Sequence, residues 1–141
     1  PSRYIPLRCP RPTQNPKRRP VKPINPKEKL LRFSDHWHPR RIATVNQMQV
    51  LLAKVSGTFL WHAHAEEDEL FQVLKGTLYM RFRDRTETIR EGELIVVPKG
   101  VEHCPETRGG EEVHLLLFEP LTTAHTGTVQ SERTQTHYPE I

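Results

Sequence analysis

Short stretches in which apolar and polar residues alternate dominate the chain from residue 45 to residue 120. Leu78, Met80 and Phe82 fall on one face of an extended segment, with Tyr79 on the other. Glycine, proline and charged residues separate the stretches, as is typical of turns. The segments expected to form strands are 45–55, 58–64, 69–76, 77–83, 86–90, 94–98 and 111–120. Because no helical pattern lies between them, they predict an all-β fold, an antiparallel sandwich or a small barrel.

One helix is expected before the first strand. Asn25 is a good N-cap residue, Pro26 suits the first helical position, and Glu28 completes a capping box. Pro39 is incompatible with a helix interior and should end the helix. The sequence therefore predicts an N-terminal helix over residues 26–39.

The charge of the chain is unevenly distributed. Residues 1–29 hold nine of the 21 Lys and Arg residues and one of the 17 acidic residues, so the net charge of +4 combines +8 in this stretch with −4 in the remainder. Net charge therefore gives no support for nucleic-acid binding by the folded core.

Residues 1–25 are expected to form an extended, basic, proline-rich arm without a core of its own. The first interpretation is a linker or terminal tail, and the second is an arm that lies over a partner subunit. A third is contact with an anionic polymer or surface through Lys17, Arg18 and Arg19. The prolines argue against the amphipathic helix of an organellar targeting peptide.

The two cysteines, Cys9 and Cys104, have no paired spacing, so they predict neither a disulfide framework nor a cysteine zinc site. A reducing, intracellular setting is the corresponding expectation. No apolar run approaches the ~20 residues of a membrane helix, and no signal-peptide pattern is present. We therefore expect a soluble, cytoplasmic protein.

Two histidines and a run of acids stand beside the apolar segment 69–76. His62 and His64 are two residues apart, so in a strand both side chains project from the same face. Glu66, Glu67 and Asp68 fit a solvated turn, whereas Glu69 opens the returning strand and should lie next to His64 across the ladder. Parallel imidazoles and one carboxylate are the donors of a divalent-cation site.

A fourth candidate ligand follows the segment 94–98. Pro98 and Gly100 predict a tight turn, which can direct His103 back toward the interior of the fold. Three imidazoles and one carboxylate suit Fe, Mn, Ni, Cu or Zn, and the ligand types alone do not select among these metals.

The spacing of these residues resembles the two sequence motifs of the cupin superfamily. The first motif reads His62-x-His64, four residues, Glu69, six residues and Gly76, and the second reads Gly92, five residues, Pro98-x-Gly100, two residues and His103. The resemblance covers about residues 45–120 and is strongest to small single-domain bacterial cupins, including uncharacterised and mannose-6-phosphate isomerase-like proteins. The sequence departs from the motifs at Gly57, which lies one residue too close to His62, and at Thr107, which stands where asparagine is frequent.

This resemblance implies a double-stranded β-helix, or jelly-roll barrel, over residues 40–120, followed by a C-terminal tail over residues 121–141. It also implies one divalent transition-metal ion in the mouth of the barrel. The metal ligands would be His62, His64, Glu69 and His103.

The remaining histidines are less informative. His114 shares a strand face with Glu112 and Leu116, so it is a candidate to line the cavity behind the metal ligands or to contact substrate; a packed or exposed histidine is the alternative. The histidines expected in solvent are His36, His38, His125 and His137. Cys104 is expected as a small buried residue. The aromatic residues expected to pack are Phe59, Trp61, Phe71 and Phe82.

Three functions are consistent with such a site. The leading hypothesis is a metal-dependent oxidoreductase, dioxygenase-like, acting on a small oxygen-rich or 1,2-dioxygenated compound. The alternative enzyme is a sugar or hydroxy-acid isomerase, epimerase or lyase, and the third function is a non-enzymatic metal- or ligand-binding module. A homodimer is expected, with Trp61 and the N-terminal arm as contributors.

Overall fold

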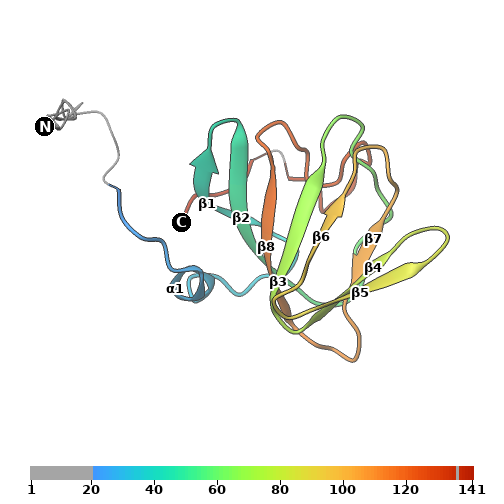
Figure 1. Cartoon of the computed structure of the whole chain (residues 1–141), viewed down its shortest axis with the longest axis horizontal. Coiled ribbons are helices and arrows are strands. Elements are labelled where there is room, and N and C mark those ends of the chain that lie inside the picture. The colour runs from blue at the N-terminus through green and yellow to red at the C-terminus, as the bar shows by residue number, and fades with distance from the viewer. Residues whose placement is uncertain (1–20, 136) are drawn as a thin grey trace, which may run out of the picture.

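The computed structural model describes residues 21–135 and 137–141, so most of the predicted basic arm lies outside the described residues. These described residues form one short helix and eight strands (Figure 1). Their bounds are α1 Pro26–Leu30, β1 Arg40–Val45, β2 Met48–Val55, β3 Glu69–Lys75, β4 Thr77–Arg81, β5 Thr86–Arg90, β6 Leu94–Val97, β7 Cys104–Glu106 and β8 Val113–Pro120.

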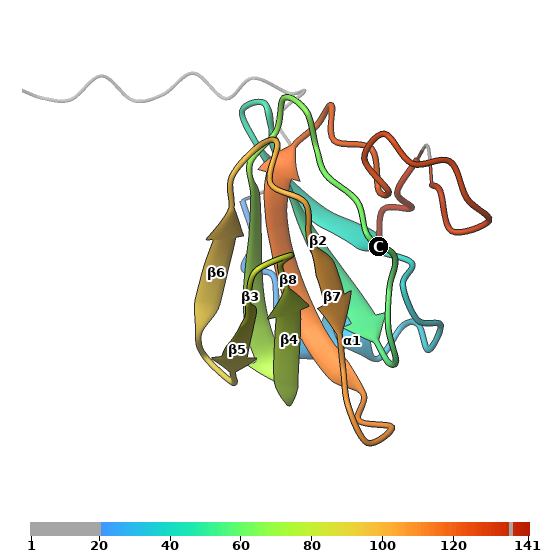
Figure 2. The same cartoon turned by 90° about the vertical axis from the view of Figure 1, so that its right-hand side faces the viewer.

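The strands form two sheets, and every strand pair is antiparallel. The larger sheet has the order β1-β2-β8-β3-β6, which Figure 1 shows face on, and the smaller one has the order β5-β4-β7. Figure 2 shows the smaller sheet in front of the larger one. Between them lies the main core, which includes Leu51, Val73, Leu78, Met80 and Leu115. The predicted all-β antiparallel architecture is thus confirmed.

The strand predictions needed correction at three places. The predicted strand 45–55 begins later, as β2 at Met48, because the chain turns at Asn46, whose φ is 54°. Segment 58–64 is not a continuous strand: it makes only isolated bridges, from Thr58 to Glu106 and from His62 to His103. Strands β1 and β7 were not predicted from the sequence. Strand β7 has only three residues and pairs with the distant β4. Strand β1 pairs with the neighbouring β2, but its register shifts between Arg41 and Ala43, so regular alternation does not reveal it.

The predicted helix over residues 26–39 forms only as far as Leu30. Its start is as expected, since the Asn25 side chain accepts a hydrogen bond from the Lys27 N–H at 3.0 Å. Beyond it, Phe33 packs in an outer apolar cluster with Leu30, whereas Trp37 packs in the main core. A continuous helix would place residues four apart on one face. The chain therefore unwinds so that Phe33 and Trp37 reach different clusters.

The C-terminal segment 121–141 closes one end of the fold. Its last residues join the edge of β1, where the Arg41 N–H donates to the Pro139 carbonyl at 2.9 Å and the Ile141 N–H donates to the Arg41 carbonyl at 3.1 Å. Figure 2 shows the segment, in red, beside the green loop between β2 and β3. In the part of the chain that the structure describes, no helix has the length and apolar character needed to cross a membrane.

Candidate metal centre

His62 and His103 are joined by their backbones. The His62 N–H donates to the His103 carbonyl at 3.0 Å, and the His103 N–H donates to the His62 carbonyl at 2.9 Å. The same two segments meet again where the Gly100 N–H donates to the His64 carbonyl at 2.7 Å. The turn at Pro98–Gly100 therefore returns the chain to the His62–His64 segment, and all three imidazoles are buried.

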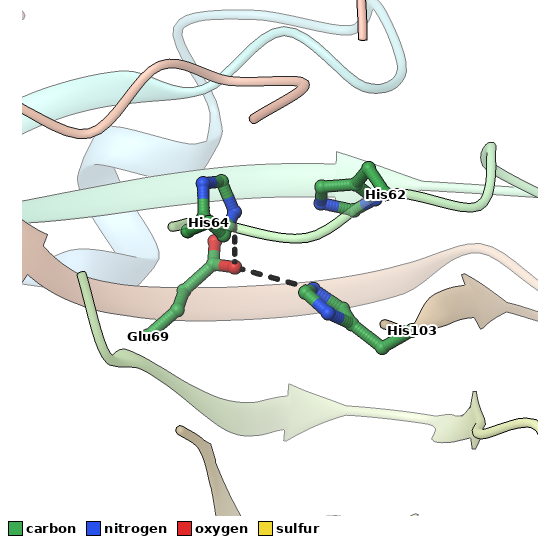
Figure 3. A group of neighbouring side chains, drawn as sticks. All are labelled: His62, His64, Glu69 and His103. Carbon is green, nitrogen blue, oxygen red and sulfur yellow. Dashed lines mark ion pairs between the residues drawn. The ribbon is translucent and has the colours of Figure 1, made fainter. Parts of the chain in front are cut away.

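Glu69 completes this group from the first position of β3. Its Oε2 lies 3.1 Å from His64 Nε2 and 3.5 Å from His103 Nε2 (Figure 3). The structure brings all four predicted residues together, with one potential ligand atom from each within 4.8 Å of the others. The predicted backbone arrangement was wrong, however. Glu69 pairs with Val97 in the sheet and not with His64, so only the side chains meet.

The acidic turn before Glu69 is partly engaged with the protein. Glu66 is exposed, as predicted. Asp68 is also exposed, but its Oδ1 accepts a hydrogen bond from the Lys99 N–H at 2.8 Å. Glu67 accepts one from the Thr122 hydroxyl at 3.1 Å. These contacts connect the turn to the Pro98–Gly100 loop and to the C-terminal segment, so the turn is more than a solvated rim.

Two of the imidazoles are fixed by backbone carbonyl groups. His62 Nδ1 lies 3.0 Å from the Leu60 carbonyl oxygen, and His103 Nδ1 lies 2.9 Å from the Val101 carbonyl oxygen. A carbonyl oxygen only accepts, so each Nδ1 must carry the proton. In the neutral imidazole the lone pair is then on Nε2, and this arrangement is typical of metal-binding histidines.

Several atoms of the cluster lack hydrogen-bond partners. These buried atoms are His64 Nδ1, His64 Nε2, Glu69 Oε2 and His103 Nε2. His64 Nε2 and Glu69 Oε2 are close, yet their geometry is not that of a hydrogen bond. Buried polar groups without partners are costly, at about 1–3 kcal/mol each, and are rare in native proteins. A cation would satisfy Glu69 Oε2, His103 Nε2 and one of the two His64 nitrogens together, so the residues fit a metal ion.

The protonation states also suit a cation. Burial and, to a smaller extent, the neighbouring His103 lower the pKa of His62 to about 4, so the ring is neutral at pH 7. Burial by itself would raise the pKa of Glu69. The imidazoles of His103 and His64 oppose this effect and hold the pKa of Glu69 below its ordinary value, so its carboxylate is charged. Neutral imidazoles and an ionised carboxylate are the forms that bind metals.

A second buried acid, Glu119, was missed from the sequence. It shares the inner face of β8 with Leu115 and Leu117 and accepts a hydrogen bond from Gln49 Nε2 at 3.1 Å. Burial raises the pKa of Glu119, and the charge of Glu69 raises it further. Burial and the nearby Glu119 likewise raise the pKa of Tyr138. Period-two alternation along β8 was the available signal, since it places Glu119 between the sheets.

The interpretation of His114 as a cavity residue was wrong. Because Val113 and Leu115 point into the core, His114 projects from the opposite face of β8. There its Nε2 contacts Glu112 Oε1 at 2.8 Å, and it lines a surface groove beside α1. The apolar residues on this face pack around α1, which made both faces of β8 look like core.

The remaining predictions have mixed outcomes. His36 and His137 are exposed, as predicted, and His38 is partly exposed. The prediction for His125 was wrong, because its ring is half-buried 5.1 Å from that of Phe59. Cys104 is buried, as predicted.

The aromatic residues also differ from one another. Phe59, Phe71 and Phe82 pack in the main core, as predicted. Trp61 does not join this core. It is half-exposed, with the Arg83 guanidinium 3.9 Å from the centre of its ring.

Comparison with known proteins gives a consistent result. Residues 49–119 match the family model described as "Cupin domain". The crystal structure of a cupin-2 domain-containing protein from Shewanella frigidimarina NCIMB 400 is 47% identical, with a TM-score of 0.67, and the match covers 69% of this chain and 93% of that one. A crystal structure from Neisseria meningitidis is 34% identical, with a TM-score of 0.63, and covers 70% of this chain and 99% of that one.

A curated relative, the protein YdbB of Bacillus subtilis strain 168, is 38% identical over 78 residues. These residues are 55% of this chain and 63% of the relative, so the chain spans less than two thirds of that protein. Together with the sheet order, the matches confirm the predicted jelly-roll barrel.

Proposed function

The chain belongs to the cupin domain family, and we propose that it binds one divalent transition-metal ion through His62, His64, Glu69 and His103. The single observation that carries this proposal is the cluster of buried ligand atoms without hydrogen-bond partners. The carbonyl groups of Leu60 and Val101 hold two of the imidazoles in the tautomer that binds a metal, and Glu69 supplies the compensating negative charge. Fe, Mn, Ni, Cu and Zn all suit such donors.

The reaction class that we propose is a metal-dependent oxidation, dioxygenase-like, of a small compound with two adjacent oxygen atoms. A transition metal in such a site supplies Lewis-acid polarisation, an activated water molecule or a binding position for oxygen. The protein contributes a mainly apolar environment: Phe59, Phe71 and Leu117 line a cavity that also contains His62 and Glu69. Exclusion of water strengthens the electrostatic effects within such a site.

Glu119 favours a second candidate function, a redox-neutral isomerisation, epimerisation or lyase reaction on a hydroxy acid or sugar. Its carboxyl group lines the same cavity, and burial and Glu69 raise its pKa. A carboxyl group with a raised pKa can exchange a proton with a substrate. The two candidates differ in their need for oxygen. Oxygen uptake by the Fe(II)-, Mn(II)- or Cu(II)-loaded protein with catechols or α-hydroxy ketones supports the first, and turnover under argon supports the second.

Metal binding itself is tested by titrating protein stripped with EDTA against each of the five metals in a calorimeter. We expect one site per chain for at least one metal. His62→Ala and His103→Ala should each weaken binding by more than the ~10–100-fold typical of residues behind the ligands. His114→Ala is the matched control, because this histidine lies on the outer face of β8. Equal weakening in the control and the two ligand variants would contradict the proposed ligand set.

A homodimer remains part of the proposal. Leu94 and Val96 of the edge strand β6 are about half exposed, at 55% and 49%, and the nearby Val101 is also exposed. An exposed apolar edge strand is a natural surface for a second subunit. Light scattering tests it: the wild type should have the mass of two chains, and Val96→Lys should have the mass of one.

A further inference from the structure

The cavity beside the four-residue cluster is mainly apolar. Ten of the fifteen residues that line it are Ala, Val, Leu, Phe, Trp or Pro, among them Trp37, Phe59 and Leu115. Two members of the metal cluster, His62 and Glu69, form part of the same wall. A small molecule bound at the cluster from this side would therefore place the rest of its body against apolar side chains.

The cavity has five polar residues, and some of their hydrogen-bonding groups are already engaged within the protein. Besides His62 and Glu69 they are Glu119, His125 and Tyr138. Glu119 already accepts from Gln49, and His125 Nδ1 lies 2.7 Å from the Arg133 carbonyl oxygen. Additional hydroxyl groups on a bound molecule would thus be buried with few partners, at a cost of about 1–3 kcal/mol each.

The C-terminal segment supplies part of the cavity wall and limits its size. His125 and Tyr138 come from this segment, and Tyr138 is only 6% exposed. Arg133 Nη1 donates to the Thr58 carbonyl at 3.0 Å, which holds the segment against the loop that carries His62 and His64. The space open to a water molecule in the cavity is about 30 Å³, enough for about two waters at ~10–15 Å³ each.

We propose that this cavity selects a ligand with two adjacent oxygen atoms at its metal-binding end and a compact apolar body, and that Tyr138 sets the size of that body. The inference rests on the proposed metal site and adds the substrate class. It disfavours polyhydroxylated compounds such as sugars, because the mainly apolar wall would leave most of their hydroxyl groups without partners.

Two α-hydroxy acids of nearly equal shape test the polarity of the cavity. 2-Hydroxybutyrate and glycerate share the same metal-binding end and differ in one terminal group, methyl or hydroxyl. Their binding to the Co(II)-loaded protein is followed by visible absorption, and each affinity is divided by that for free Co(II). We expect 2-hydroxybutyrate to bind about 10–100-fold more tightly, the range for a hydrophobic site that meets an added hydroxyl.

The role of Tyr138 is tested with mandelate, whose phenyl group is much larger. Tyr138→Ala should increase the affinity for mandelate at least tenfold and leave that for 2-hydroxybutyrate within about threefold, since only the larger body needs the vacated space. Tyr138→Phe keeps the ring and is the matched control; its affinities should follow those of the wild type. Cobalt content and the melting temperature establish that each variant is folded and loaded.

The outcomes separate the two levels of the proposal. If cobalt binds but glycerate binds as tightly as 2-hydroxybutyrate, the apolar ligand class is wrong and the metal site stands. If Tyr138→Ala changes the affinities for mandelate and 2-hydroxybutyrate equally, Tyr138 does not set the size. If the wild type takes up no cobalt or other metal, the proposed function itself fails. Should Tyr138→Ala not fold, the comparison of the two acids on the wild type still decides the polarity of the cavity.

Discussion

The backbones of His62 and His103 exchange two hydrogen bonds, of 3.0 and 2.9 Å, although these residues are 41 positions apart. This bridge lies outside the regular strands and fixes the two loops that carry the imidazoles. Each ring is fixed in turn by the carbonyl group two residues before it, from Leu60 or Val101. Because the loops and the two rings are already held in place, binding of a metal ion would cost little conformational entropy.

Metal binding should stabilise the fold, because the ligands come from segments far apart in the sequence. At a free metal concentration about 100 times Kd, the free energy of unfolding should rise by about 2.7 kcal/mol, which corresponds to several degrees in Tm. Scanning calorimetry with and without EDTA measures the change. His64→Ala should abolish the gain, whereas His36→Ala, at an exposed histidine, should retain it. A gain of equal size in both variants would locate the metal elsewhere.

At Gly127 the C-terminal segment lies so close to the backbone of Ala63 that a side chain larger than hydrogen does not fit. The φ of Gly127 is 57°, and a Cβ at this position would overlap the carbonyl oxygen of Ala63, the residue between His62 and His64. Gly127→Ala should therefore destabilise the protein by about 1–3 kcal/mol more than Gly109→Ala. Gly109 has a similar φ of 64°, but its Cβ would meet open space, so the control carries the backbone strain alone. Urea unfolding measures the loss of stability in both glycine variants. Equal losses would show that the segments around Gly127 and Ala63 do not pack as described.

Glu119→Gln should destabilise the protein less than Glu119→Ala. In metal-free protein at pH 7, Glu119→Gln mimics the protonated acid that burial and Glu69 favour, so its stability should equal or exceed that of the wild type. Glu119→Ala removes the acceptor of Gln49 Nε2 and should cost about 1–3 kcal/mol in urea unfolding. If the amide costs as much as the alanine, Glu119 is charged in the folded state and its raised pKa is wrong.

The pKa of Glu112, which directly precedes β8, predicts that the stability of the protein depends on pH. Hydrogen bonds from His36 and His114 lower the pKa of Glu112 to about 2 from an ordinary value of 4.5. A lowered pKa stabilises the folded state above the ordinary value, and the contribution is lost as the pH falls from about 4.5 to about 2. Glu112→Gln should therefore be less stable than the wild type at pH 6, by less than about 1 kcal/mol because water screens this partly exposed group.

Urea unfolding of the two proteins between pH 6 and pH 3 follows this difference, which should shrink toward the acid end. A difference that grows as the pH falls has the wrong sign and would contradict the assignment to Glu112. Glu132→Gln, at an exposed glutamate of the C-terminal segment, is the matched control that removes the same charge.

The local pattern predicted the cluster better than its surroundings. His62, His64 and Glu69 lie within eight residues, and Pro98 and Gly100 bend the chain just before His103, so short-range spacing carried enough information. The same spacing did not predict where Glu119 or the C-terminal segment 121–141 lies. These positions depend on which face of β8 turns inward and on where residues 121–141 return, and both are set by tertiary packing.

His114 and the helix illustrate the same limit. Both faces of β8 carry apolar residues, because one packs on the main core and the other on the cluster around α1. Alternation then leaves two equivalent choices, so the sequence could not decide whether His114 lines the cavity or lies on the outer face. The helix prediction failed for a related reason, since Phe33 and Trp37 belong to different clusters.

The central claim is that three imidazoles and one carboxylate hold a transition metal, and X-ray absorption spectroscopy of the loaded protein tests it most directly. We predict nitrogen and oxygen neighbours only, with the outer scattering of three imidazole rings, which falls to two rings in His103→Ala. A sulfur neighbour from Cys104, or a number of imidazoles unchanged in His103→Ala, would contradict the account.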